Sequence, residues 1–235
     1  MVWPPRTALM ADSMALRAFL GYELTEATPD HSSLSRTRRL MSVETHRLVF
    51  QFVLEVLAKE GLLRGGTLGV DATALEANAA LRSIVRRDTG EGYEQFLTGL
   101  AAASGIKTPT REDLARIDRK RPKKGSNDDW TNPNDPDARI TKMKDGRTHL
   151  AHKAEHAVDM DTGAVVSVTL QPADRGDTQT VGETVDEARR NLRKVAASPR
   201  ARRRLRPVRE IVTDKGYHSN GTVRGLHEDG LQTYI

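Results

Sequence analysis

The sequence has 235 residues, of which 37% are hydrophobic and 4% aromatic, enough for one sizeable domain and a smaller helical one. It contains no cysteine, which excludes disulfides and thiolate metal sites, and no apolar run approaches the ~20 residues that span a bilayer. The 37 basic residues outnumber the 32 acidic ones and give a formal net charge of +5, which suits a polyanionic partner because phosphate contacts release counterions. Since Pro4 and Pro5 stand where a signal peptide would be apolar, we expect a cytoplasmic protein with no membrane partner.

The first 65 residues are predicted to form a small helical module. A side chain that can cap a first turn precedes each of its three helices: Ser13, then Asp30 or Ser32, then Ser42. Gly21 and Gly61 provide stops after the first and third helices. Apolar residues recur at helical spacing in the third helix, namely Leu48, Val49, Phe52, Val53, Val56 and Leu57. The polar side of the module carries Arg36, Arg38, Arg39 and Arg47.

From Thr67 the pattern changes to a short strand followed by long helical and polar segments. Residues 68–73 are typical of a buried strand, and residues 75–104, rich in Ala and Leu, are predicted to be helical. Residues 108–148 are polar and rich in turn-forming residues. This composition predicts a solvated insertion with helix only around residues 111–118.

The rest of the chain predicts a hairpin, a helix and two further strands. Residues 149–159 and 164–170 form the hairpin around a turn at residues 161–163. A helix at 178–197, a strand at 207–214, a short helix reaching Asp229 and a strand at 231–235 complete the order. This order favours a mixed α/β sheet over strict βαβ alternation.

Two aspartates, Asp71 and Asp214, belong to two of these short apolar strands. If the strands end side by side, the two carboxylates can reach the same ions. Carboxylate oxygens suit Mg²⁺ or Mn²⁺, and a pair of such ions can stabilise the attacking and leaving oxygens in phosphoryl transfer. The alternative is that each is an ordinary strand-end aspartate that caps a helix.

Five segments carry specific motifs: Pro29-Asp30-His31-Ser32-Ser33-Leu34-Ser35, Val70-Asp71-Ala72-Thr73 with Glu76-Ala77-Asn78-Ala79, Asp135-Pro136-Asp137-Ala138-Arg139, His152-Lys153-Ala154-Glu155-His156-Ala157-Val158-Asp159, and Thr213-Asp214-Lys215-Gly216-Tyr217. In this order, they resemble the DDE-type transposases of bacterial insertion sequences, which have a ribonuclease-H-like catalytic core. The Asp-Lys-Gly-Tyr segment is the most specific, and the resemblance extends from about Met14 to Ile235. It implies a mixed α/β fold: a ribonuclease-H-like core of five strands with flanking helices, preceded by the helical N-terminal module.

The resemblance also implies the domains and the site. Residues 1–65 are the helical module, a candidate for DNA binding, and residues 66–235 are the core with an insertion at about 75–148. Asp71 and Asp214 are the expected catalytic residues and ligands of two Mg²⁺ or Mn²⁺ ions, which activate water and then a DNA 3′-hydroxyl. The family's third acid is a Glu on a helix after the fifth strand. Glu228 precedes that strand and is not assigned the role, so we expect a copy that is short at both ends.

The expected partner is double-stranded DNA, both the ends of an insertion sequence and the target, and a homodimer is considered for the complete enzyme. Candidate DNA contacts are Lys153, Lys215, Tyr217, Arg202, Arg203 and Arg204. The basic runs at 119–124 and 200–206 are equally compatible with solvated loops in a basic protein.

Several alternatives remain open from the sequence. A chain without the third acid could be a catalytically inactive DNA-binding remnant rather than an enzyme for DNA recombination. A helical DNA-binding regulator fused to an unrelated α/β domain would require a helix-turn-helix. His152 to His156 match the H-x-x-E-H of inverted zinc proteases, but that motif works on a helix and this segment predicts a strand. A haloacid-dehalogenase-like phosphatase would need an aspartate where Thr73 stands.

Overall fold

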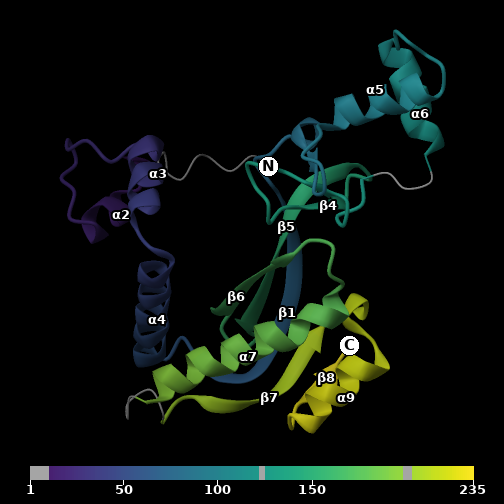
Figure 1. Ribbon diagram of the computed structural model, residues 1–235. Coiled ribbons are helices and arrows are strands. Elements are labelled where there is room, and N and C mark those ends of the chain that lie inside the picture. The colour runs from purple at the N-terminus through teal and green to yellow at the C-terminus, as the bar shows by residue number, and fades with distance from the viewer. Residues whose placement is uncertain (1–10, 122–124, 198–202) are drawn as a thin grey trace. The chain divides into compact units, whose positions relative to one another are not determined.

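The computed structural model describes residues 11–121, 125–197 and 203–235 (Figure 1). The chain divides into two compact units, Met1–Val53 and Leu54–Ile235. Within the described ranges, no helix combines the length and the apolar content needed to cross a membrane.

The first unit consists of helices whose starts follow the predicted caps. These are α2 (Met14–Phe19), α3 (His31–Leu40) and the first part of α4 (Val43–Glu60). The side chains of Ser13, Asp30 and Ser42 accept the backbone amides of Leu16, Ser33 and Thr45, at 3.2, 2.7 and 3.1 Å. The three caps are therefore confirmed, with Asp30 rather than Ser32 capping α3.

The second unit is built on one six-stranded sheet. Its strands are β1 (Gly65–Glu76), β4 (Arg139–Lys142), β5 (Thr148–Asp159), β6 (Val165–Pro172), β7 (Arg206–Thr213) and β8 (Gln232–Tyr234). Their order is β4-β5-β1-β7-β8, with β6 also pairing with β5. Strand β5 runs antiparallel to β1, β4 and β6, whereas β7 is parallel to β1 and β8 is parallel to β7. This mixed sheet with its helices confirms the predicted α/β class and is consistent with a ribonuclease-H-like core.

Helix α7 (Asp177–Ala196) covers one face of the sheet. The residues predicted to share its apolar face, Val181, Val185, Ala188 and Leu192, are all buried. The strands supply Leu68, Val70, Val166 and Ile211 to the same core, each with at most 3% of its surface exposed. A short 3₁₀ turn, η2 (Lys215–Tyr217), and helix α9 (Asn220–Glu228) connect β7 to β8.

The prediction of helix over residues 75–104 is wrong for its first part. Strand β1 continues to Glu76, and η1 (Leu81–Ser83) and β2 (Val85–Arg86) follow before α5 (Tyr93–Ala103) begins. The end of β1 is held by pairing with β5, from Thr73 opposite Ala154 to Glu76 opposite Ala151. This pairing between distant segments overrides the helical propensity of the Ala-rich sequence.

The polar stretch after residue 108 is also more ordered than its composition predicts. Helix α6 (Arg111–Lys120) lies where helix was expected, and β3 (Trp130–Thr131) pairs with β2. Trp130 is only 2% exposed and belongs to a Trp130 cluster made of Ile84, Trp130, Ala138 and Leu150, packed by Tyr93, Phe96 and Ile140 among others. The insertion therefore has a small apolar core of its own and is not only a solvated loop.

Candidate active site

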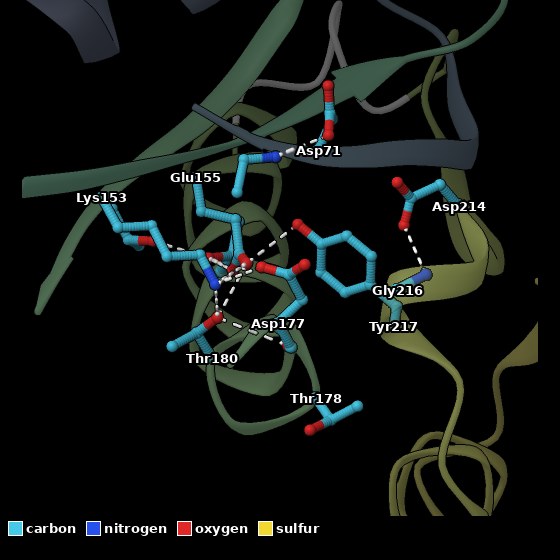
Figure 2. A network of polar contacts seen from close by, with 12 residues as sticks. Asp71, Lys153, Glu155, Asp177, Thr178, Thr180, Asp214, Gly216 and Tyr217 are labelled. Carbon is cyan, nitrogen blue, oxygen red and sulfur yellow. Dashed lines mark hydrogen bonds and ion pairs between the residues drawn. The ribbon is translucent and has the colours of Figure 1, made fainter. Parts of the chain in front are cut away.

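Strands β1 and β7 bring Asp71 and Asp214 to neighbouring positions. The two strands are parallel and adjacent, with Val70 opposite Thr213. Asp71 and Asp214 are the residues that follow this pair, Asp71 within β1 and Asp214 directly after the end of β7. Figure 2 shows Asp214 at the point where β7 ends in η2 and Asp71 on the neighbouring strand β1.

Each of the two carboxylates uses one oxygen locally. Oδ1 of Asp71 accepts the amide of Ala72 at 2.8 Å, and Oδ1 of Asp214 accepts the amide of Gly216 at 2.8 Å. Both residues are exposed, and no described group donates a hydrogen bond to Oδ2 of either. Asp214 thus caps η2, as expected of an ordinary aspartate at the end of a strand, but its Oδ2 oxygen can still bind an ion.

A buried carboxylate, Glu155, lies on the opposite face of the sheet from Asp71, because Asp71 is paired with the next residue of β5, His156. Its side chain comes from β5 and is fully buried. Oε1 accepts hydrogen bonds from the hydroxyls of Thr180 and Tyr217, at 2.8 and 3.0 Å, and Oε2 accepts one from Thr184. A buried charge needs such donors, because removal from water is costly unless it is paired and hydrogen-bonded.

Lys153 supplies a positive charge beside Glu155. Its Nζ lies 2.6 Å from Oδ1 of Asp177 and 3.5 Å from Oε1 of Glu155. It also donates to the hydroxyl of Thr180 at 2.8 Å, whose single proton is used toward Glu155. We refer to Lys153, Glu155, Asp177, Thr180, Thr184 and Tyr217 as the Glu155 network, most of which is labelled in Figure 2.

Two of the predicted DNA contacts, Lys153 and Tyr217, belong to this network. They are 5% and 1% exposed, and both polar groups contact protein atoms. Burial and, after it, the charges of Glu155 and Asp177 raise the pKa of Tyr217 far above its usual range, so its hydroxyl stays protonated. The structure thus places both side chains inside the protein, in the polar network around a buried carboxylate.

The other predicted DNA contacts that the structure describes lie on the surface. Lys215, Arg203 and Arg204 are exposed, and Nη1 of Arg204 lies 3.5 Å from the carbonyl oxygen of Lys59. Arg202 lies outside the described residues.

The histidines of the H-x-x-E-H match lie on strand β5, as predicted. Alternation along the strand puts His152 and His156 on one face and Glu155 on the other, so the three side chains cannot share one ion. Nε2 of His152 instead lies 2.9 Å from Oδ2 of Asp135, which lowers the pKa of that aspartate. Within the described part of the chain, no group of three or more His, Asp or Glu side chains is arranged to hold a metal ion.

Sequence reasoning missed several residues around the site. His156 stands directly opposite Asp71 in the β1–β5 register, so the two side chains share a face. Asp177, Thr180 and Thr184 on α7 were not singled out at all. The signal that could have found the network is the polar pair Lys153 and Glu155. The two residues lie two positions apart, and so on one face, of strand β5, which is paired with β1 and with β6.

Comparison with known proteins identifies a family. The model of a family described as the transposase DDE domain matches residues 103–235. This range contains Asp214 and the whole Glu155 network, whereas Asp71 lies before it. No curated protein and no solved structure matches the chain.

Proposed function

We propose that this chain, which belongs to the family of DDE transposases, uses Asp71 and Asp214 to bind the divalent ions at which a DNA phosphodiester is broken and joined. The family acts in transposition, its substrate is DNA and its members generally use divalent metals. The observation that supports the proposal is the β1–β7 register, with Val70 opposite Thr213, because Asp71 and Asp214 are the next residues along these two adjacent parallel strands.

The two carboxylates fit a magnesium or manganese ion by their chemistry. Mg²⁺ is usually held by one or two carboxylates, with water and substrate phosphate completing the coordination. Oδ2 of Asp71 and of Asp214 are exposed oxygens without a described donor, and the local amide bonds to Oδ1 limit the rotation of each carboxylate. Bound ions would supply an activated nucleophile and neutralise charge on the phosphate.

The remaining residues of the chain would position the DNA. Lys215 directly follows Asp214 and is exposed, so its ammonium group can contact a phosphate next to the site. Arg203 and Arg204 could contact the backbone further away. Residues 1–65 would form a DNA-binding module through the exposed arginines of α3 and α4, and the DNA would carry the ends of an insertion sequence. A homodimer would bring two such ends together.

A second function, DNA binding without catalysis, is favoured by one observation. The described residues contain no group of three acids around Asp71 and Asp214, whereas the family resemblance implies three. Metal binding separates the two functions, because an inactive remnant has no need to keep an ion at these aspartates.

The test is manganese binding to the purified chain, measured from the electron paramagnetic resonance signal of free Mn²⁺. We expect Asp71→Asn and Asp214→Asn each to weaken binding by at least about tenfold, because each removes an anionic ligand. Asp128→Asn, which neutralises an exposed aspartate in the insertion, is the matched control and should change nothing. Equal affinities in all four proteins would remove Asp71 and Asp214 from the site.

A further inference from the structure

The Glu155 network joins three segments that are far apart in the sequence. Glu155 and Lys153 come from β5, Thr180 and Thr184 from α7, and Tyr217 from the turn η2. The carboxylate accepts hydroxyl groups from both α7 and η2. No other described carboxylate is fully buried and bonded to these two elements at once.

The direction of the hydrogen bonds explains why the network is tight. Thr180 gives its single proton to Glu155 and must accept from Lys153. Thr184 gives its proton to the other oxygen, so Thr169 is the donor in the contact between the two threonines. The Tyr217 hydroxyl donates to Oε1 of Glu155 at 3.0 Å. The tyrosine hydroxyl therefore shares Oε1 of Glu155 with the Thr180 hydroxyl.

Tyr217 and Asp214 lie at the two ends of the same short turn. Asp214 caps η2, and the amide of Tyr217 donates to the carbonyl oxygen of Asp214 at 3.2 Å. On one side the turn is held by the pairing of β7 with β1. On the other side it is held by the Tyr217 side chain, which is 1% exposed. The orientation of the Asp214 carboxylate thus depends on where the Tyr217 ring is anchored.

Gly216 shows how little space this turn has. A Cβ atom at Gly216 would lie 3.0 Å from Oδ1 of Asp214 and 3.1 Å from Oδ2 of Asp177. Both distances are tighter than ordinary carbon–oxygen contacts. The turn is therefore packed between the candidate metal ligand and the first residue of α7, and a shift of α7 or of Tyr217 would be transmitted to Asp214.

We propose that Glu155 and Tyr217 are positioning residues for the metal site: the buried Glu155 carboxylate fixes the Tyr217 hydroxyl, and Tyr217 fixes the turn that presents Asp214 to the ion. The inference rests on the proposed role of Asp71 and Asp214. Neither Glu155 nor Tyr217 touches the ion or the DNA. Their contribution is to keep Asp214 in place before the ion binds, as outer hydrogen bonds do around metal ligands in general.

The test compares Tyr217→Phe with Ser167→Ala in the full chain. Each variant removes one buried hydroxyl that makes one hydrogen bond, from Tyr217 to Glu155 and from Ser167 to the carbonyl oxygen of Thr184. Both bonds reach the sheet–α7 interface, but the Ser167 hydroxyl bonds to α7, whereas the Tyr217 hydroxyl comes from η2. We expect Tyr217→Phe to weaken Mn²⁺ binding by about five- to tenfold, while Ser167→Ala leaves it unchanged, at a temperature where circular dichroism shows both to be folded.

Glu155→Gln gives a second measurement at the other end of the same bond. If both residues act through one contact, the variant that combines Tyr217→Phe and Glu155→Gln should bind Mn²⁺ no more weakly than the single variant with the lower affinity. The reason is that effects within one network do not add. Should Glu155→Gln fail to fold, Tyr217→Phe alone decides the question.

The outcomes separate this inference from the proposed function. If Asp71→Asn and Asp214→Asn weaken Mn²⁺ binding but Tyr217→Phe does not, or if Ser167→Ala weakens it equally, the positioning role is overturned and the metal site stands. If none of the aspartate variants affects binding, the proposed function itself has failed, and the positioning role fails with it.

Discussion

Two clusters of the second unit bury large side chains in different ways. The Trp130 cluster is apolar, with the rings of Tyr93 and Phe96 packed edge-on against Trp130 at 4.9 and 5.4 Å between centroids. The Glu155 network is polar and charged, and every group in it depends on the orientation of another. Apolar contacts are non-directional and tolerate adjustment, whereas a hydrogen-bonded charge specifies one geometry. We infer that the first cluster stabilises the insertion and the second also shapes the site.

Removal of the central ring of the Trp130 cluster should have the largest effect on stability. Trp130→Ala deletes a side chain that is 2% exposed and leaves a cavity, which costs about 3–5 kcal/mol. The loss should appear in urea unfolding of the whole chain or as early unfolding of the insertion. Mn²⁺ affinity, measured below the first transition, should stay unchanged. A large loss of affinity would show that the two clusters are not independent.

Removal of the charge in the Glu155 network should cost somewhat less stability but also affect the site. Lys153→Met keeps most of the side-chain length and deletes the ammonium group 2.6 Å from Asp177 and 3.5 Å from Glu155. We expect about 3 kcal/mol of destabilisation, because a buried carboxylate loses its cation. The three hydroxyl donors that remain limit the loss. Unfolding in urea measures it, and a change within error of zero would mean that the hydroxyls alone balance the charge.

Addition of a methyl group to the turn should act mainly on the metal site. Gly216→Ala places a Cβ near Oδ1 of Asp214 and Oδ2 of Asp177, so one carboxylate must move by a few tenths of an ångström. We expect a stability loss of only about 1 kcal/mol together with a several-fold weaker Mn²⁺ affinity. Gly225→Ala, on the neighbouring helix α9 with open space around its Cβ, is the control. Equal Mn²⁺ affinity in the two variants would contradict the prediction and would mean that the turn can accept a methyl group at Gly216 without moving Asp214.

The smallest expected effect is a pH dependence at the far end of β5. A hydrogen bond to Asp145, and to a lesser extent one to Glu76, raises the pKa of His149. The protonated imidazole therefore stabilises the folded state fully below the unfolded pKa of ~6.5. That contribution is lost as the pH rises through the raised folded pKa. His149→Gln should therefore flatten the decline of the unfolding free energy between about pH 6 and 8. Since His149 is at the surface, an unchanged slope would mean that solvent screens both contacts.

The difference between the two clusters also explains what the sequence could predict. Strands β5 and β6 and helix α7 lie within about two residues of the predicted ranges, because their apolar periodicity is local. The position of Asp214 directly after an apolar strand was visible for the same reason, whereas Asp71, expected at the end of its strand, lies within β1. The end of β1 was mistaken for helix, since its pairing with β5 comes from residues about 80 positions later.

The Glu155 network could not be predicted because it depends on three-dimensional pairing. In the sequence, Lys153 and Tyr217 are polar residues in basic or glycine-containing segments, which favours the surface. Only the packing of α7 on β5 shows that they face a buried carboxylate. The Trp130 cluster was missed for a simpler reason, since its apolar residues are scattered through a polar stretch without periodicity.

The most direct test of the metal site is a crystal structure of the chain grown with Mn²⁺, with the ion located by its anomalous scattering. We expect at least one ion within ~2.2 Å of an oxygen from each of Asp71 and Asp214, with the Tyr217 hydroxyl still bonded to Glu155. An ion bound elsewhere, or the two carboxylates turned away from each other with no ion between them at saturating Mn²⁺, would contradict the central claim.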